Sequence, residues 1–313
     1  MCKPSPDRPL KLGTRRSPLA LAQAEEARSR LIAVHGLDPA AVELVTVLAS
    51  GDRIQDRPLA EIGGKALWTK ELDAVLLAGL IDIAVHSAKD VETLRPPQIA
   101  IVAVLPREDV RDVLVGAASI PALPQRARVG TSAPRRAAQL LHARPDCRIV
   151  PFRGNVATRL ARLAAGEADA TFLAAAGLNR LGETGVGHPL PAEEWLPAPG
   201  QAAIAIEARA DDEKTRALLA AIDHSPSRAE LLAERALLAA LGGNCHSPVA
   251  VLSLREGTEI ELRAALFSPD GAERVDGAAR FAEGDAGGPA RLAAELLSRA
   301  SASIAAHFSG PAG

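Results

Sequence analysis

Short β-rich runs and longer helical runs alternate at the start of the chain. Residues 10–12 are predicted to form a short strand, residues 18–34 carry helical spacing, and residues 42–48 are apolar and β-rich. This order predicts a βαβ unit with a parallel sheet. Ser17 is a good N-cap and Pro18 a good first helical residue, so we expect the helix to begin there.

The same pattern then appears a second time. RVGTSAP at 128–134 echoes KLGTRRSP at 11–18, and GEADA at 166–170 echoes GLIDI at 79–83. The repeat predicts two similar α/β lobes, each of which aims a helix N-terminus and its free N–H groups at an anion.

A third unit follows the two lobes. It contains a helix over 227–240, strands near 249–254 and 259–267 joined to a hairpin turn SPDG, and a terminal helix over 289–306. A strand over 203–207 could return to the first lobe, with a two-stranded hinge near residues 105–111 and 196–201. The predicted fold class is α/β, with two lobes, a hinge and a small C-terminal α+β domain. The expected domains are 1–105 with 202–221, then 106–201, then 222–313.

Composition narrows the class of protein. The chain has 313 residues, is 48% hydrophobic and 24% charged, and has a net charge of −2. These values are ordinary for a globular protein and give no reason to expect a nucleic-acid or membrane partner. No apolar run reaches the roughly 18 residues that span a bilayer. Three cysteines are too few for a disulfide framework, so a reduced, cytoplasmic protein is expected.

Cys245 lies in the loop LGGNCHSP, where two glycines are expected to end the preceding helix. Most free cysteines are small buried hydrophobes, which is one interpretation here. A zinc site lacks partner ligands at the usual spacing, so no metal is expected. A cysteine hydrolase would need a positioned histidine, and His246 is a weak candidate because neighbouring side chains in a loop point apart. The accessible loop leaves Cys245 as a candidate nucleophile.

The motif HSAKD ends a predicted strand at Lys89 and Asp90. A surface ion pair between these neighbours would contribute little. Open α/β sheets place their ligands at the carboxyl ends of strands, so a functional role for Asp90 is favoured. A carboxylate there could transfer protons or stabilise a developing cation.

Nine arginines but only one acidic residue occur between Arg126 and Arg162. Arg135 and Arg136 fall in the first turn of a predicted helix, where cations oppose the helix dipole. That cost indicates a bound polyanion, and arginine suits carboxylates through its bidentate fork. A two-lobed anion-binding protein without catalysis would also explain these arginines, but it leaves Asp90 and Cys245 without a role.

Nine motifs together resemble the porphobilinogen deaminase (hydroxymethylbilane synthase) family. They occur in the family's order and cover nearly the whole chain: GTRRSPLALAQA, GGKALWTKEL, IDIAVHSAKDV, PREDVRD, VGTSAPRRAAQL, FRGNVATRL, AAAGLNRLG, LPAPGQAAIAIE and LGGNCHSPVA.

The resemblance implies two lobes like type II periplasmic binding proteins and a cysteine-bearing domain. It implies a dipyrromethane cofactor held by a thioether bond to Cys245. The implied reaction is a transferase reaction of porphyrin (heme) biosynthesis: four porphobilinogen molecules are condensed head to tail onto this primer, ammonia is released each time, and hydroxymethylbilane is hydrolysed off. The implied partners are this small-molecule substrate alone, in a monomer.

Site residues follow from the same residue-by-residue match. Asp90 matches the catalytic carboxylate, which would stabilise the azafulvene cation left when ammonia departs. The implied cofactor contacts are Lys89, Asp90, Thr131, Ser132, Arg135, Arg136 and Arg159. The implied substrate contacts are Arg15, Ser17, Lys65, Trp68, Arg153 and Arg180. Residues 50–64 match the family's mobile flap.

The chain departs from the family's pattern at three places. Asn244 precedes the cysteine where a glycine is usual, and Trp68 replaces a frequent phenylalanine. Ala133 and Pro134 replace a Ser-Leu pair, which puts one hydroxyl contact to the cofactor in doubt. None of these changes removes a catalytic group.

Overall fold

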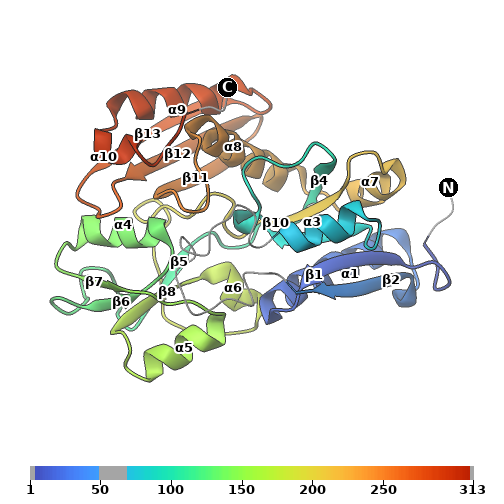
Figure 1. The fold of residues 1–313 in the computed structure, drawn as a ribbon, viewed down its shortest axis with the longest axis horizontal. Coiled ribbons are helices and arrows are strands. Elements are labelled where there is room, and N and C mark those ends of the chain that lie inside the picture. Colours follow the sequence, from blue (N-terminus) through green and yellow to red (C-terminus); the bar gives the residue numbers. More distant parts are fainter. Residues whose placement is uncertain (1–3, 49–68, 311–313) are drawn as a thin grey trace. The chain divides into compact units, whose positions relative to one another are not determined.

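The computed structural model describes residues 4–48 and 69–310 (Figure 1). These residues form two compact units. The first unit holds residues 4–48, 69–108 and 203–228, and the second holds 109–202 and 229–310. No helix within the described ranges is both long enough and apolar enough to cross a membrane.

A five-stranded sheet organises the first unit, in the order β2-β1-β3-β10-β4. β1 runs parallel to β2 and β3, whereas β10 runs antiparallel to both β3 and β4. The strand from late in the sequence therefore lies inside the first sheet. The bounds are β1 (Leu10–Arg15), β2 (Val42–Val47), β3 (Ile83–Ser87), β4 (Ile99–Val104) and β10 (Ile204–Arg209).

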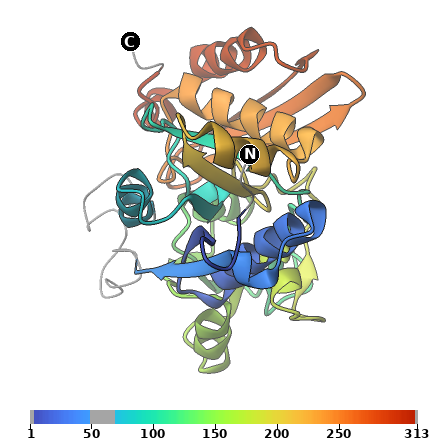
Figure 2. The same ribbon diagram turned by 90° about the vertical axis from the view of Figure 1, so that its right-hand side faces the viewer.

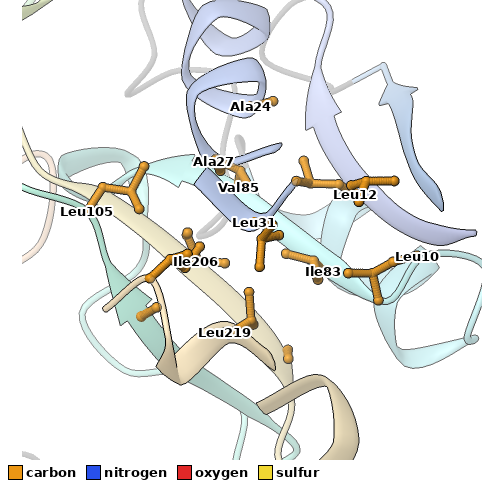
Figure 3. Close-up of a cluster of buried hydrophobic side chains, with 14 of the residues drawn as sticks. Leu10, Leu12, Ala24, Ala27, Leu31, Ile83, Val85, Leu105, Ile206 and Leu219 are labelled. Atoms are coloured by element: carbon orange, nitrogen blue, oxygen red, sulfur yellow. The ribbon is translucent and has the colours of Figure 1, made fainter. Parts of the chain in front are cut away.

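Helices cover both faces of this sheet. Helices α1 (Pro18–His35) and α7 (Glu213–Ala220) pack on one face, and α3 (Lys70–Leu77) packs on the other. Figure 3 shows the first of these cores, in which Leu31 of α1 and Leu219 of α7 meet Ile206 of β10. The predicted start of α1 is confirmed, because Ser17 Oγ accepts a hydrogen bond from the Ala20 N–H. Gly36 ends the helix in the left-handed conformation that glycine adopts without steric cost.

The second unit contains a sheet with the same arrangement, in the order β7-β6-β8-β5-β9. β6 runs parallel to β7 and β8, as β1 does to β2 and β3. β5 is antiparallel to β8 and β9, so it takes the place of β10. The predicted repeat is thus confirmed at the level of strand order. The bounds are β5 (Asp112–Val115), β6 (Arg128–Gly130), β7 (Arg148–Val150), β8 (Ala170–Ala174) and β9 (His188–Pro189).

Helices again lie on both faces of the second sheet. Leu140 of α4 (Pro134–Ala143) packs with Phe172 and Trp195 on one face. On the other face, α5 (Val156–Ala164) and α6 (Ala175–Arg180) pack against Val113 and Leu173. The alternation of Phe172 and Leu173 to opposite faces is the period-2 pattern of a strand buried on both sides.

A three-stranded antiparallel sheet forms the rest of the second unit, with β11 (Val249–Glu256), β12 (Glu259–Phe267) and β13 (Arg274–Ala282). One face packs against both α8 (Ser225–Leu241) and α9 (Gly287–Arg299) (Figure 2). The opposite face supplies Ala250, Leu252 and Phe267 to a cluster with Ala138 of α4 and Leu196. The chain is therefore an α/β protein with an added α+β sheet.

Two local predictions differ from the structure. The terminal helix predicted over 289–306 is two helices, α9 and α10 (Ala302–Ala305). Ala300 is extended between them, and Ser301 caps α10 by accepting from the Ile304 N–H. Strand β13 was not predicted, because its polar and small residues give a weak apolar alternation. It pairs with β12 along its whole length after the predicted turn, where the Gly271 N–H donates to Ser268 O.

Candidate functional site

A pocket in the first unit lies at the carboxyl ends of β1 and β3. Arg15 ends β1, Ser17 begins α1, and Asp90 ends the short 3₁₀ turn η3 (Ala88–Asp90) that follows β3. All three residues line the pocket, and Arg15 Nη1 lies 3.8 Å from Asp90 Oδ2. Ser87 Oγ hydrogen-bonds to the side-chain amide of Gln23 on α1, which ties the ends of the two elements together. The sequence predicted Asp90 at the end of a strand and Ser17 at the start of a helix, whereas β1 extends to Arg15, three residues beyond its predicted end.

The four side chains predicted for this part of the site are all half-buried. Asp90, Lys89 and Arg15 are half-buried, so each reaches solvent while resting on the sheet. Ser17 is also half-buried and already serves as the cap of α1. Lys65 and Trp68, which were predicted to bind substrate, and the predicted flap at 50–64 lie outside the described residues.

The second unit presents its predicted cofactor contacts at the end of β6 and the start of α4. Thr131 is buried, and its Oγ1 accepts a hydrogen bond from the Ala133 N–H, so it supports the entry to the helix. Ser132 Oγ is buried and has no hydrogen-bond partner among the described residues. Ala133 is the N-cap and offers no side-chain cap, as the sequence indicates.

Arg135 and Arg136 have an internal counter-ion that sequence reasoning missed. Nη2 of each guanidinium donates to a different oxygen of Asp112, each at 2.7 Å. Asp112 is fully buried, and it also accepts hydrogen bonds from Trp195 Nε1 at 2.9 Å and Gln201 Nε2 at 2.9 Å. The unfavourable interaction of two cations with the dipole of α4 is therefore offset in part by the carboxylate of Asp112, so a bound polyanion is not its sole explanation.

The charge of this buried cluster remains positive. Arg135 and Arg136 are 4% and 5% exposed, and Asp112 neutralises one of their two charges. Burial alone would raise the pKa of Asp112, but the two guanidiniums hold it well below its ordinary range. Burial disfavours the charged form of Arg135 as well and therefore lowers its pKa, whereas the attraction of Asp112 acts in the opposite direction. Nε of each arginine is buried without a hydrogen-bond partner in the described part of the chain.

Three further predicted arginines lie around the second sheet. Arg159 is half-buried near the start of α5, where its Nε donates to Gly154 O at 3.0 Å. Arg153 is half-buried just before that helix. Arg180 is half-buried at the end of α6, and its Nη2 donates to Ala202 O at 3.0 Å. Ala202 has a φ of 70°, one of two left-handed residues other than glycine in the described chain.

Cys245 is exposed in the turn after α8, as predicted. Gly242 takes a left-handed φ of 65° at the end of the helix. A Cβ on Gly243 would come within 2.7 Å of Leu238 Cδ1, so a larger residue at this second glycine would crowd the Leu238 side chain. Asn244 Oδ1 accepts a hydrogen bond from the His246 N–H at 2.8 Å, which forms an Asx turn around Cys245. The unusual asparagine thus has a structural role.

Asp112 and Gln201 could have been found in part from sequence. Asp112 begins the apolar strand DVLV, where an acidic residue is out of place unless it is paired. Both residues lie within motifs of the family resemblance, but nothing local indicates that they meet across 89 positions of the chain.

These features define a mixed α/β protein of two similarly wound lobes and a cysteine-bearing α+β domain, with arginines, a carboxylate and a thiol as its functional groups. Solved structures with similar folds include a putative periplasmic sulfonate-binding protein from Methylobacillus flagellatus KT, at 16% identity and a TM-score of 0.40 over 76% of this chain and 70% of that one. Another is a periplasmic His/Glu/Gln/Arg/opine family-binding protein from Silicibacter pomeroyi, at 18% identity and a TM-score of 0.36 over 68% of this chain and 88% of that one.

Family models cover most of the chain. Residues 10–217 match "Porphobilinogen deaminase, dipyromethane cofactor binding domain", and residues 229–298 match "Porphobilinogen deaminase, C-terminal domain". The chain is 57% identical over 306 residues to a porphobilinogen deaminase of Sphingopyxis alaskensis, covering 96% of each chain. It is 51% identical over 307 residues to that of Paracoccus denitrificans, covering 96% of this chain and 97% of the relative.

The chain belongs to the porphobilinogen deaminase family. It is therefore an enzyme, a transferase of tetrapyrrole biosynthesis with a dipyrromethane cofactor binding domain. This assignment confirms the resemblance in the motifs and overturns the two alternatives, a binding protein without catalysis and a cysteine hydrolase.

Proposed function

We propose that the chain condenses four porphobilinogen molecules head to tail onto a dipyrromethane primer joined to Cys245, with Asp90 as the catalytic carboxylate. The observation that carries this proposal is the pocket at the ends of β1 and β3, which brings Asp90 and Arg15 together. A carboxylate and a guanidinium in one pocket can hold an aminomethyl pyrrole by its ring nitrogen and by its acidic side chains.

The second unit has the groups that a dipyrromethane requires. The thiol of Cys245 is exposed and can form a thioether. Ser132 Oγ and the Nε atoms of Arg135 and Arg136 are buried polar atoms in need of partners. The uncompensated positive charge beside Asp112 favours a carboxylate of the cofactor. When bound, the dipyrromethane would supply the free pyrrole carbon to which the first ring is joined, and each later ring would be joined to the ring added before it.

The chain's own residues would divide the remaining work. Asp90 would accept hydrogen bonds from the pyrrole N–H of the substrate and stabilise the positive charge that develops as ammonia leaves. Lys89, with Thr131, Ser132, Arg135, Arg136 and Arg159, would hold the cofactor. Arg15, Ser17, Arg153 and Arg180 would bind the acetate and propionate groups of the substrate, together with Lys65 and Trp68. Each added ring brings two carboxylates, which explains the number of arginines.

We also propose three domains, 1–105 with 202–221, 106–201 and 222–313. The chain passes between the compact units at Glu108–Asp109, at Ala202–Ala203 and again at Arg228–Ala229, and the first two of these crossings support a two-stranded hinge near the predicted segments. We further propose that the enzyme acts as a monomer in the cytoplasm. A dimer in size-exclusion chromatography with light scattering would contradict the monomeric state. Cell fractionation that finds the protein outside the cytoplasm would contradict the proposed location.

Intact-mass spectrometry tests the proposal directly. The purified active protein should carry extra mass equal to two linked pyrrole units, and Cys245→Ser should lose it. Asp90→Ala should keep the fold and lose nearly all turnover of porphobilinogen. A bare polypeptide in active enzyme would exclude the covalent primer, and near-normal turnover by Asp90→Ala would exclude the catalytic role of that carboxylate.

A further inference from the structure

A buried ion-pair network lies in the first unit, and none of the roles above uses it. Arg95 Nε and Nη2 donate to the two oxygens of Glu207, each at 2.8 Å. Its Nη1 and Nη2 also donate to the two oxygens of Asp73, at 3.0 and 2.6 Å. One guanidinium therefore binds two carboxylates through two bidentate edges, which is the strongest geometry available to arginine. We call Arg95, Asp73, Glu207 and His86 the Arg95 network.

His86 joins this network to the pocket. Its Nε2 lies 3.2 Å from Glu207 Oε2, and the residue also lines the pocket that contains Asp90. Glu207 is fully buried, and burial alone would raise its pKa; His86 and Arg95 lower the pKa to about 2. Asp73, His86 and Glu207 lie close enough together to hold a metal ion, but the guanidinium already occupies the position of the cation.

The Arg95 network reaches both sides of the turn that carries Asp90. His86 lies four residues before Asp90 on β3, and Arg95 lies five residues after it, at the end of an irregular segment. Arg95 Nη1 also lies 3.6 Å from Glu92 within that segment. Asp73 on α3 and Glu207 on β10 belong to regular elements, so they give the turn two rigid attachment points.

We propose that the Arg95 network positions the Ala88–Asp90 turn, and that Arg95 is a positioning residue for the carboxylate of Asp90. This inference rests on the proposed catalytic role of Asp90. Shifting the turn would require the guanidinium to leave two buried carboxylates, whose desolvation makes separation costly. The turn also has backbone hydrogen bonds from the Ala88 N–H to Ala203 O at 2.9 Å and from the Val91 N–H to Ala88 O at 3.2 Å. It lies outside the strands and α-helices, and loops hold catalytic geometry poorly without side-chain support.

The test compares three variants of the cofactor-loaded enzyme. Arg95→Leu removes the charge and keeps the bulk, while Arg95→Lys keeps a charge but loses the fork. Arg209→Leu is the matched control: Arg209 is on β10, and it donates to Leu76 O, at the end of α3, and to Ile81 O, both at 2.9 Å, away from the Asp90 turn. The measurements are kcat and KM for porphobilinogen, the cofactor mass, and amide hydrogen exchange over residues 86–95.

Arg95→Leu should lower kcat by about 10- to 100-fold, the effect of a displacement on the order of 1 Å. KM should change far less, the cofactor mass should remain, and hydrogen exchange should rise over residues 88–93. Arg95→Lys should recover part of kcat, and Arg209→Leu should keep it. If Arg95→Leu does not fold, Asp73→Asn replaces it, with a smaller expected loss because Glu207 still holds the guanidinium. Wild-type kcat in a folded Arg95→Leu or Asp73→Asn variant overturns the inference, as does an equal loss in Arg209→Leu. If the Arg95 variants overturn this inference while Asp90→Ala still loses activity, the proposed function is retained. The positioning role of Arg95 and the catalytic role of Asp90 are therefore tested separately.

Discussion

Asp112→Asn should destabilise the second unit severely while changing a single atom. The carboxylate pairs with two buried guanidiniums and accepts two more hydrogen bonds. An asparagine has nearly the same shape, but it presents an amide N–H₂ to one of the arginines and carries no charge. Arg135 and Arg136 are then left buried with like charges and without the protein carboxylate that pairs with both.

The size of the effect follows from the burial of this cluster. Removing one partner of a buried ion pair costs about 3–5 kcal/mol, since the remaining charge is left uncompensated. A domain's whole stability is on the order of 5–15 kcal/mol, so the loss is a large fraction of it. With a urea m value of about 2–3 kcal/mol/M, the unfolding midpoint should fall by about 1–2.5 M.

Trp195 provides a local probe for this measurement. Its indole N–H donates to Asp112, and its ring stacks on Phe172 at a centroid distance of 5.0 Å. The chain has two tryptophans, so Trp68→Phe leaves Trp195 as the only one. Fluorescence during urea unfolding then reports the second unit itself.

Asp109→Asn is the control for this substitution. Asp109 pairs with Arg111 at 2.6 Å, as close as the buried pairs, but the Arg111 side chain is 45% exposed. Exposed pairs contribute about 0–1 kcal/mol, so this midpoint should barely move. Equal midpoints for Asp112→Asn and Asp109→Asn would refute the argument that burial makes the Asp112 pairs important.

The pH dependence gives a second check on Asp112. Its pKa is lower in the folded state than in the unfolded chain, so the folded state releases its proton more readily. The stabilisation is therefore complete above the unfolded pKa of about 3.9 and declines as pH falls below it. The difference between wild type and Asp112→Asn should be constant from pH 7 to about 5 and should shrink below about 4.

Three further outcomes are expected. Glu207→Gln should destabilise the first unit by about 3 kcal/mol at pH 6. Because the pKa of Glu207 is lowered to about 2 from 4.5, that difference should diminish between pH 4.5 and 2, and a difference that grows on acidification would contradict the pairing. Ala202→Gly should raise the melting temperature, because a left-handed alanine costs about 1–2 kcal/mol and glycine's extra chain entropy offsets only about half of this; a lower melting temperature would show that the φ of 70° is not a strain. Gly271→Ala should cost about 1–3 kcal/mol, since its Cβ would come within 2.5 Å of His142 N on α4, and calorimetry showing no change would count against this packing.

The sequence by itself determined the features that depend on neighbouring residues. Ser17 and Pro18 begin α1, Gly36 ends it, and Gly242 ends the helix before Cys245, because caps act within one turn of the chain. The position of Asp90 at the end of a strand followed from the apolar run before it. The motifs that resemble the family also lie in continuous segments, so the class of enzyme could be predicted without a structure.

Tertiary structure decided the interactions between residues that are far apart in the sequence. The inference that Arg135 and Arg136 require an anion was sound in its electrostatics, but Asp112, 23 and 24 positions away, supplies part of that anion. Arg95 and Glu207 are separated by 112 positions, and nothing local indicates that they meet. Such pairs depend on which strands become neighbours in a sheet, as when β10 lies between β3 and β4. Burial then gives these contacts their strength, and burial is a property of the folded chain that no local pattern of residues specifies.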